Sequence, residues 1–156
     1  MKFKISREDL LQPLQLVVGV VERRQTLPIL SNVLIALKDN CLSMTGTDLE
    51  VEIVGHVMLR DPEANGEITV PARKLMDICR SLPESTDITF TEKDGKVQII
   101  SGRSRFTLSS LPADEFPSID EGDSGKSFNI SNKEINNLIS RTSFAMAQQD
   151  VRYYLN

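Results

Sequence analysis

Three stretches of the chain share one pattern of apolar and polar positions. Each begins with two apolar residues two positions apart, the spacing of a half-buried strand. Each then carries apolar residues three and four positions apart, the spacing of an amphipathic helix. The stretches begin at residues 3, 68 and 128, so their starts lie 65 and then 60 residues apart, and they read FKISREDLLQPL, ITVPARKLMDIC and FNISNKEINNLI. The pattern predicts a strand followed by a helix, three times.

The predicted helices have recognisable starts. Ser6 and Ser131 are N-cap candidates, each with an acidic residue three positions later, and Pro71 suits a first turn. Pro13 falls inside the first helix, where proline costs about 3 kcal/mol, so we expect a kink or a late helix start there. The residues expected to face a core are Leu10, Leu14, Val17 and Val18, then Leu75, Ile78, Cys79 and Leu82, then Ile135, Leu138 and Ile139.

Between the helices the apolar residues alternate with polar ones. Residues 33–59 predict a hairpin that turns at Asp39-Asn40, followed by a further strand, and residues 87–111 predict the same around Asp94-Gly95. The second turns, MTGTD at 44–48 and ISGRS at 100–104, also look alike. The repeating unit is therefore a strand, a helix and three strands, and two copies precede residue 112.

The composition changes after the second copy. Residues 112–126, PADEFPSIDEGDSGK, are rich in Pro, Asp, Ser and Gly, which indicates a linker. We therefore divide the chain into a first domain at 1–120, with an acidic linker that begins near residue 112, and a second part at 121–156. The third repeat opens after the linker, and VRYYLN at 151–156 has the residues of a strand. We expect the chain to be a fragment that ends where the next domain has barely begun.

Composition narrows the class of protein. Of the 156 residues 40% are hydrophobic and 26% charged, and no apolar run approaches the roughly 20 residues of a membrane span, so we expect a cytoplasmic protein without a membrane partner. Cys41 and Cys79 lie 38 residues apart without a metal-binding motif, so we expect two small buried hydrophobes and no cofactor. The single histidine, His56, is expected at a solvated strand position.

The charge is distributed unevenly. A net charge of −4 and a pI near 5.1 argue against a protein that coats DNA with a basic surface. However, residues 1–30 and 71–82, which hold the first two predicted helices, are net positive, whereas residues 31–70 and 113–126 are net negative. A basic helical face would attract phosphate without reading sequence. The alternative is that these lysines and arginines form only the polar side of amphipathic helices.

Longer blocks of the sequence resemble a known family. TLPILSNVLI, LSMTGTDLEVEI, TVPARKLMDICRSLP, SGRSRFTLSSLPADEFP and AMAQQDVRYYLN are similar to the bacterial DNA polymerase III β subunit, the sliding-clamp family, and the resemblance covers essentially the whole chain. It implies the DNA-clamp fold, an α+β fold in which the duplicated unit places its helices on one face of antiparallel sheets. It also implies a processivity factor, not an enzyme, that encircles duplex DNA as a head-to-tail homodimer.

The resemblance assigns roles to particular residues. It implies DNA contacts at Arg24, Arg73, Gln149, Tyr153 and Tyr154, with Lys74, Arg80 and Arg103 as weaker candidates. It implies a subunit interface at Lys74, Ile78, Leu82, Phe106 and Leu108, and it places Leu155 at the rim of a groove for partner peptides. The implied partners are duplex and primed DNA, a second clamp subunit, the clamp loader, the polymerase III catalytic subunit and other proteins with a clamp-binding motif.

Two further interpretations stay open at this point. Asp48, Glu50 and Glu52 could hold Mg²⁺ in a phosphodiesterase, although no second carboxylate cluster or phosphate-binding loop accompanies them. A generic protein-interaction module without nucleic acid is the other alternative. The strand pattern also leaves open whether Phe106, which shares a strand face with Leu108, meets a partner or fills the core of its own domain.

Overall fold

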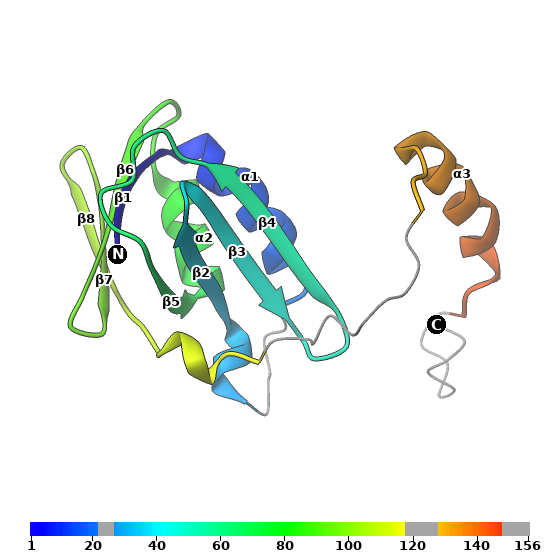
Figure 1. Ribbon diagram of the computed structural model, residues 1–156, viewed down its shortest axis with the longest axis horizontal. Helices are drawn as coiled ribbons and strands as arrows, with labels where there is room; N and C mark the ends of the chain where they lie inside the picture. Colours follow the sequence, from blue (N-terminus) through cyan, green and yellow to red (C-terminus); the bar gives the residue numbers. More distant parts are fainter. Residues whose placement is uncertain (22–26, 118–127, 148–156) are drawn as a thin grey trace. The chain divides into compact units, whose positions relative to one another are not determined.

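The computed structural model describes residues 1–21, 27–117 and 128–147 (Figure 1). The chain forms two compact units, Met1–Ile119 and Asp120–Asn156, and each is described by itself. The helices and strands of the first unit are β1 (Lys2–Ser6), α1 (Arg7–Val18), β2 (Asn32–Lys38), β3 (Cys41–Thr47), β4 (Glu52–Met58), β5 (Gly66–Pro71), α2 (Ala72–Ser81), β6 (Asp87–Lys93), β7 (Lys96–Ser101) and β8 (Ser104–Ser109). The described part of the second unit contains α3 (Asn132–Thr142).

The first unit contains the predicted strand, helix and three strands twice, which confirms the repeat. Its strands form two antiparallel four-stranded sheets, sheet A with the order β1-β6-β7-β8 and sheet B with the order β4-β3-β2-β5. Each sheet therefore combines three strands of one repeat with the first strand of the other. The periodicity of the sequence predicted the strands but not this exchange.

The exchanged strands carry part of the core. In sheet A, Phe3 lies opposite Phe90, and their rings stack with centroids 4.8 Å apart. In sheet B, Val33 lies opposite Val70 on β5. All four side chains are fully buried. Because a cross-strand pair is formed by one residue from each repeat, both repeats are needed to complete either sheet.

Both predicted hairpins are confirmed. Asp39 and Asn40 have φ of 49° and 64°, and Asp94 and Gly95 have 51° and 70°, so each pair forms a two-residue turn with both central residues in the left-handed region. The second turns differ from the prediction. Strand β3 continues through the first of them to Thr47, and the chain turns only at residues 48–51, whereas the second repeat turns tightly at Gly102.

Helix α1 lies unusually close to sheet B. A Cβ atom added to Gly55 on β4 would lie 2.7 Å from the Pro13 Cβ, and one added to Gly46 on β3 would lie 2.7 Å from the Val17 Cγ1. The helix begins at Arg7, where the Ser6 Oγ accepts a hydrogen bond from the Asp9 amide at 3.1 Å, so the expected late start is wrong. Pro13 is instead accommodated inside the helix, with its ring against a strand glycine.

The inner faces of the two sheets and the two helices enclose one core. Of the eight positions predicted to face it in α1 and after the start of α2, seven are buried and Ile78 is half-buried against them. Burial raises the pKa of the Cys79 thiol to about 11. Cys41 was expected to be buried as well, but it is only half-buried on the outer side of sheet B, with its Sγ 3.7 Å from the Nδ1 of His56. His56 is exposed, as predicted.

Residues after β8 remain part of the first unit. The 3₁₀ helix Ala113–Glu115 leads to Phe116, which is buried against Ile29 and Leu30. The segment in which we expected the linker to begin therefore packs against the first domain as far as this phenylalanine. A buried polar chain connects the same segment to sheet B: the Asn32 Nδ2 donates to the Thr69 Oγ1 at 3.0 Å, and this hydroxyl donates to the Leu111 carbonyl oxygen at 3.0 Å.

The second unit matches the prediction only in its helix. Ser131 caps α3 in a capping box, because its Oγ accepts from the Glu134 amide while the Glu134 carboxylate accepts from the Ser131 amide. The strand expected at Phe128 and Ile130 is not formed, and Phe128 is 84% exposed. The apolar face of α3 is likewise exposed. In the first unit the corresponding strands are each paired with the other repeat, and no strand lies in the described part of this unit. The stretch VRYYLN lies outside the described residues.

The close approach of α1 predicts that Gly55→Ala destabilises the chain. The added methyl group would overlap the Pro13 ring, and overpacking of this kind costs about 1–3 kcal/mol. Urea unfolding measures the difference. Val54→Ala, on the exposed side of the same strand, is the control and should change the free energy of unfolding by at most about 0.5 kcal/mol. Equal effects of the two substitutions would contradict the proposed packing.

The buried polar chain predicts that Thr69→Val is destabilising although the two side chains have the same shape. The substitution leaves the Asn32 amide without its partner, and an unsatisfied buried polar group costs about 1–3 kcal/mol. Thr69→Ser keeps the hydroxyl and is the matched control. Thermal and urea unfolding should rank the serine variant above the valine variant, and the reverse order would show that the hydroxyl is unimportant.

Candidate nucleic-acid interface

One of the five expected DNA contacts lies in the described part of the chain. Arg73 is the second residue of α2. Arg24, Gln149, Tyr153 and Tyr154 lie outside the described residues, as does Leu155 of the expected peptide groove. Arg73 is therefore the expected DNA contact whose surroundings the structure describes.

Arg73 connects the start of α2 to the end of α1. Its Nη2 donates a hydrogen bond of 2.8 Å to the Val21 carbonyl oxygen, three residues beyond the end of α1. Its Nε is buried and has no hydrogen-bond partner in the described structure. The bond to Val21 uses one of the five N–H donors of the guanidinium group. No pattern in the sequence predicted the bond to Val21, because the two residues lie in different repeats.

The N-terminus of α2 adds to this arrangement. Its N-cap residue is Pro71, which provides no side-chain hydrogen bond to the first turn. A helix N-terminus carries unpaired N–H groups and a partial positive charge, both of which favour an anion. Lys74 follows Arg73 and is exposed. The end of α2 therefore combines two cationic side chains with uncapped backbone donors, a combination that suits a phosphate group.

The rest of the helical surface is less basic than the sequence suggested. Arg7 is held within the structure, because its Nε donates to the Cys79 carbonyl oxygen at 2.8 Å and its Nη1 pairs with Glu8 at 3.0 Å. The Glu8 carboxylate also accepts a hydrogen bond from the Ser85 amide, and this bond lowers the pKa of Glu8. Arg80 lies two turns after Arg73 on the same side of α2, with the acidic Asp77 between them.

The structure brings the expected subunit-interface residues together. Helix α2 contacts β8, which is the edge strand of sheet A. Phe106 and Leu108 share one face of this strand, as predicted. Leu82 and Leu108 are buried in the core of the unit, with 5% and 6% of their surface exposed, and Phe106 is half-buried against the same core. The surface that remains for a partner consists of Lys74, parts of Ile78 and Phe106, and the unpaired edge of β8.

One residue of the acidic cluster that could hold a metal, Asp48, has a structural role. The Asp48 Oδ1 accepts hydrogen bonds from the amides of Glu50 and Val51 at 2.9 and 2.7 Å, which closes the turn before β4. These backbone bonds, the one from Val51 above all, lower the pKa of Asp48. Within residues 1–21, 27–117 and 128–147, no group of three His, Cys, Asp or Glu side chains that could hold a metal ion comes together.

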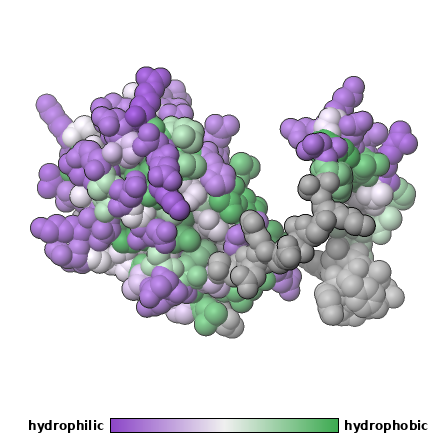
Figure 2. Space-filling model, viewed as in Figure 1, coloured by the Kyte–Doolittle hydropathy of each residue, from purple (hydrophilic) through white to green (hydrophobic). Residues whose placement is uncertain are grey.

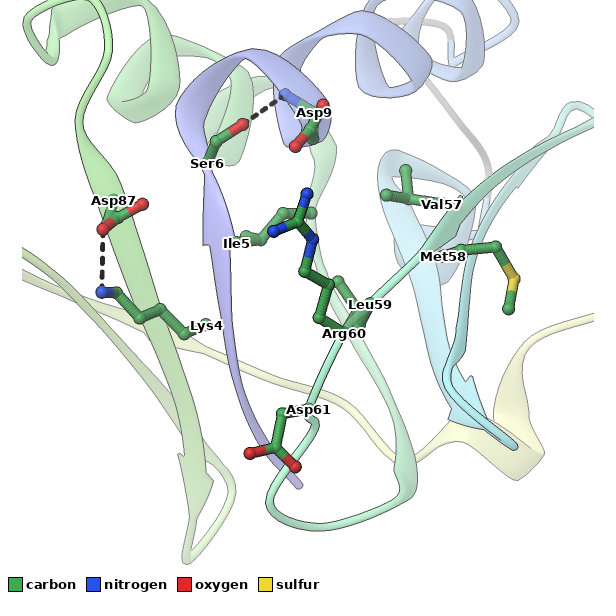
Figure 3. Close-up of a pocket in the computed structure, with 10 residues that line it drawn as sticks. All are labelled: Lys4, Ile5, Ser6, Asp9, Val57, Met58, Leu59, Arg60, Asp61 and Asp87. Carbon is green, nitrogen blue, oxygen red and sulfur yellow. Dashed lines mark hydrogen bonds and ion pairs between the residues drawn. The ribbon is translucent and has the colours of Figure 1, made fainter.

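A polar groove lies between β1 and the end of β4 (Figure 3). Its charged groups have both signs. The Lys4 Nζ pairs with the Asp87 carboxylate at 2.8 Å, and the Arg60 side chain extends toward Ser6 and Asp9. The Ser6 hydroxyl caps α1 and lies beside no histidine that could activate it as a nucleophile. Among the described residues, those that line this groove supply charged and polar groups of both signs but no set of catalytic groups. None of the described helices is long and apolar enough to cross a membrane.

Comparison with known proteins gives one consistent result. The family profile described as DNA polymerase III beta subunit, N-terminal domain, matches residues 1–120. The chain is 62% identical over 156 residues to the beta sliding clamp of Pseudomonas aeruginosa and covers 42% of that protein. It is 51% identical to the beta sliding clamp of Escherichia coli K12 over all 156 residues, or 43% of that relative. The chain thus spans about two fifths of the length of the curated relatives it matches.

Solved structures agree with the sequence relatives. The crystal structure of the DNA polymerase III subunit beta from P. aeruginosa matches with a TM-score of 0.93 and 61% identity, over 100% of this chain and 42% of that one. A structure described as Caulobacter crescentus pol III beta matches with a TM-score of 0.92 and 40% identity over the same shares. The expected α+β clamp fold is therefore confirmed. The chain belongs to the DNA polymerase III beta subunit family, and its residues 1–120 form the N-terminal domain of that family.

Proposed function

We propose that the chain is part of a DNA sliding clamp, the β subunit of DNA polymerase III, which encircles duplex DNA and keeps the replicative polymerase on its template. The observation that carries the proposal is 62% identity over all 156 residues to a beta sliding clamp. The complete protein acts as a processivity factor in the bacterial cytoplasm, and the polymerase activity belongs to its partner.

The site around Arg73 supports weak contact with the phosphate backbone. The positive charge of Arg73 and the end of α2 without a side-chain cap favour a phosphate group and do not read the bases. Such contacts suit sliding, because a closed ring is retained on DNA by its topology and individual contacts need not be strong. The proposed DNA contacts are Arg24, Arg73, Gln149, Tyr153 and Tyr154.

The edge of sheet A supports ring closure. Strand β8 has an unpaired side, and an exposed edge of this kind accepts another strand. Phe106 on β8 and Ile78 on α2 both pack partly buried against the same core, and Lys74 on α2 is exposed. We therefore assign this surface to the head-to-tail contact with a second subunit. The proposed partners beyond that subunit are the clamp loader, the polymerase III catalytic subunit and other clamp-binding proteins, which meet a groove that includes Leu155.

If the complete subunit encircles DNA, its retention on DNA should depend on whether the DNA has free ends. The complete subunit, loaded onto a nicked circular duplex, should stay bound in sizing chromatography and should be lost once the circle is linearised, because a ring slides off a free end. Blocking both ends with bulky protein should restore retention. A conventional DNA-binding protein is retained equally on circular and linear DNA, and that result would exclude a ring.

The interface assignment predicts that Phe106→Asp in the complete subunit converts the dimer into a monomer. A buried carboxylate without a partner costs several kcal/mol at an apolar contact. Thr107→Asp is the matched control, since Thr107 is the next residue of β8 and points to the opposite face. Analytical ultracentrifugation should show monomers only for the first variant. A dimeric Phe106→Asp variant, with unfolding unchanged, would place the interface elsewhere.

A further inference from the structure

Three side chains with soft donor atoms gather at one end of the outer face of sheet B. In β3 and β4 the residues that face the core alternate with residues that face away from it, and Cys41, His56 and Met58 belong to the second set. Figure 3 shows Val57 and Met58 extending to opposite sides of β4. In Figure 1 the helices lie behind sheet B, so Figure 2, drawn from the same side, shows this outer face, where hydrophilic and hydrophobic side chains are mixed. A thiol, an imidazole and a thioether thus share one patch, the soft-donor cluster of Cys41, His56 and Met58.

Cys41 and Met58 face each other across the two strands. They are Cα partners in the register, and one position further along the Leu59 amide donates a hydrogen bond of 2.8 Å to the Asn40 carbonyl oxygen. Cys41 and Met58 are therefore a non-hydrogen-bonded pair, in which side chains approach most closely, with Cβ atoms about 4.5–5.5 Å apart. Met58 is 70% exposed, and its side chain is unbranched and flexible. Its sulfur can therefore reach an ion that Cys41 holds.

The Cys41 thiol and the His56 imidazole already lie at the separation of two ligands of one metal ion. The Cys41 Sγ is 3.7 Å from the His56 Nδ1. A thiolate sulfur about 2.3 Å and an imidazole nitrogen about 2.0 Å from one tetrahedral metal ion are roughly 3.5 Å apart. A metal ion can thus take the place of the thiol proton between these two atoms with little movement of either side chain.

The surroundings of the soft-donor cluster favour a soft ion over a hard one. Within the described structure, the three side chains form no hydrogen bond or ion pair beyond the contact between Cys41 and His56. The nearest carboxylate on the same face of β4 is Glu52, four residues from His56, which corresponds to about 13 Å along the strand. The cluster therefore supplies nitrogen and sulfur donors without the carboxylate oxygens that Mg²⁺ and Ca²⁺ require.

The donor set selects copper(I) among the soft metals. Structural zinc sites use four thiolate, imidazole or carboxylate ligands, and a thioether is not one of these. Thiolate and thioether sulfur together suit Cu(I), and imidazole also binds copper. We propose that Cys41, His56 and Met58 form a three-coordinate copper(I) site on the outer face of sheet B. Binding releases the thiol proton to solvent and transfers no electron, so the ion that binds is already Cu(I).

The copper(I) site is independent of the proposed clamp function. All three ligands lie in the first unit, and the site uses neither the surroundings of Arg73 nor the edge strand β8. The ion would join β3 to β4, which is the edge strand of sheet B. Because the ion needs the folded register to meet all three ligands, its binding should raise the unfolding temperature of the chain.

Competition with a coloured copper(I) chelator tests the proposal. The 156-residue chain, kept under nitrogen, is titrated against the copper(I) complex of bicinchoninate, and the loss of colour measures the copper that the chain removes. The parent chain should remove one equivalent. Cys41→Ser should lower the affinity by about a hundredfold or more, because the loss of an outer partner of a ligand already costs about 10–100-fold. Met58→Leu should lower it by about tenfold, since it removes one ligand that is weak and exposed.

Met146→Leu is the matched control, because Met146 is 56% exposed and lies in the second unit. It should bind copper(I) within about twofold of the parent chain. X-ray absorption at the copper edge should show one sulfur ligand fewer in Met58→Leu than in the parent. Without copper, all variants should unfold at about the same temperature as the parent, because the substituted side chains lie at the surface.

The other thiol cannot replace Cys41. Cys79 is fully buried, and burial raises the pKa of its thiol to about 11. Unchanged binding by Cys41→Ser, equal effects of Met58→Leu and Met146→Leu, or displacement of the copper by an equal concentration of Zn²⁺ would each overturn the assignment. None of these results depends on whether the complete protein encircles DNA.

Discussion

The exchange of strands between the two repeats is the constraint on which the first unit depends. Strand β1 completes the sheet of the second repeat, and β5 completes the sheet of the first. The stacked pair Phe3 and Phe90 lies in the middle of one such pairing. Since each helix follows an exchanged strand directly, these pairings also fix where α1 and α2 enter the core. In the described part of the second unit, the residues around Phe128 form no strand.

The exchange of β1 and β5 between the repeats determines which strands lie at the sheet edges and how the helices pack. Each sheet has the exchanged strand at one edge and a strand of the other repeat at the opposite edge, β4 in sheet B and β8 in sheet A. Helix α1 can lie close to β3 and β4 because Gly46 and Gly55 have no side chains. Helix α2 begins at Ala72, after the N-cap Pro71, and this start brings Arg73 within hydrogen-bonding distance of the Val21 carbonyl oxygen. The proposed DNA contact and the proposed subunit contact therefore both depend on the position of one helix.

The role of each charged side chain in this protein depends on its neighbours and not on the net charge of the chain. Some cations hold the fold together, as Arg7 does by bonding the Cys79 carbonyl. Others, such as Arg73 and Lys93, keep free donors or have no counter-ion in the described structure. Contacts between such groups and phosphate would weaken as the salt concentration rises. The acidic residues of the hairpins limit this attraction to particular faces.

The sequence alone determined the structural features that are stabilised by interactions between residues close together in the chain. Local spacing and chemistry were enough to predict the helix caps, the hairpin turns and the buried helix faces. These features are the cap at Ser6, the capping box at Ser131, the turns at Asp39-Asn40 and Asp94-Gly95, and the buried faces of α1 and α2. Only the tertiary structure decided which repeat each first strand joins, that Leu108 is buried, and that Arg73 bonds Val21. These features depend on contacts between residues that are distant in the chain. An apolar pattern predicts that one face of a strand is buried, but it does not predict which strand lies beside it.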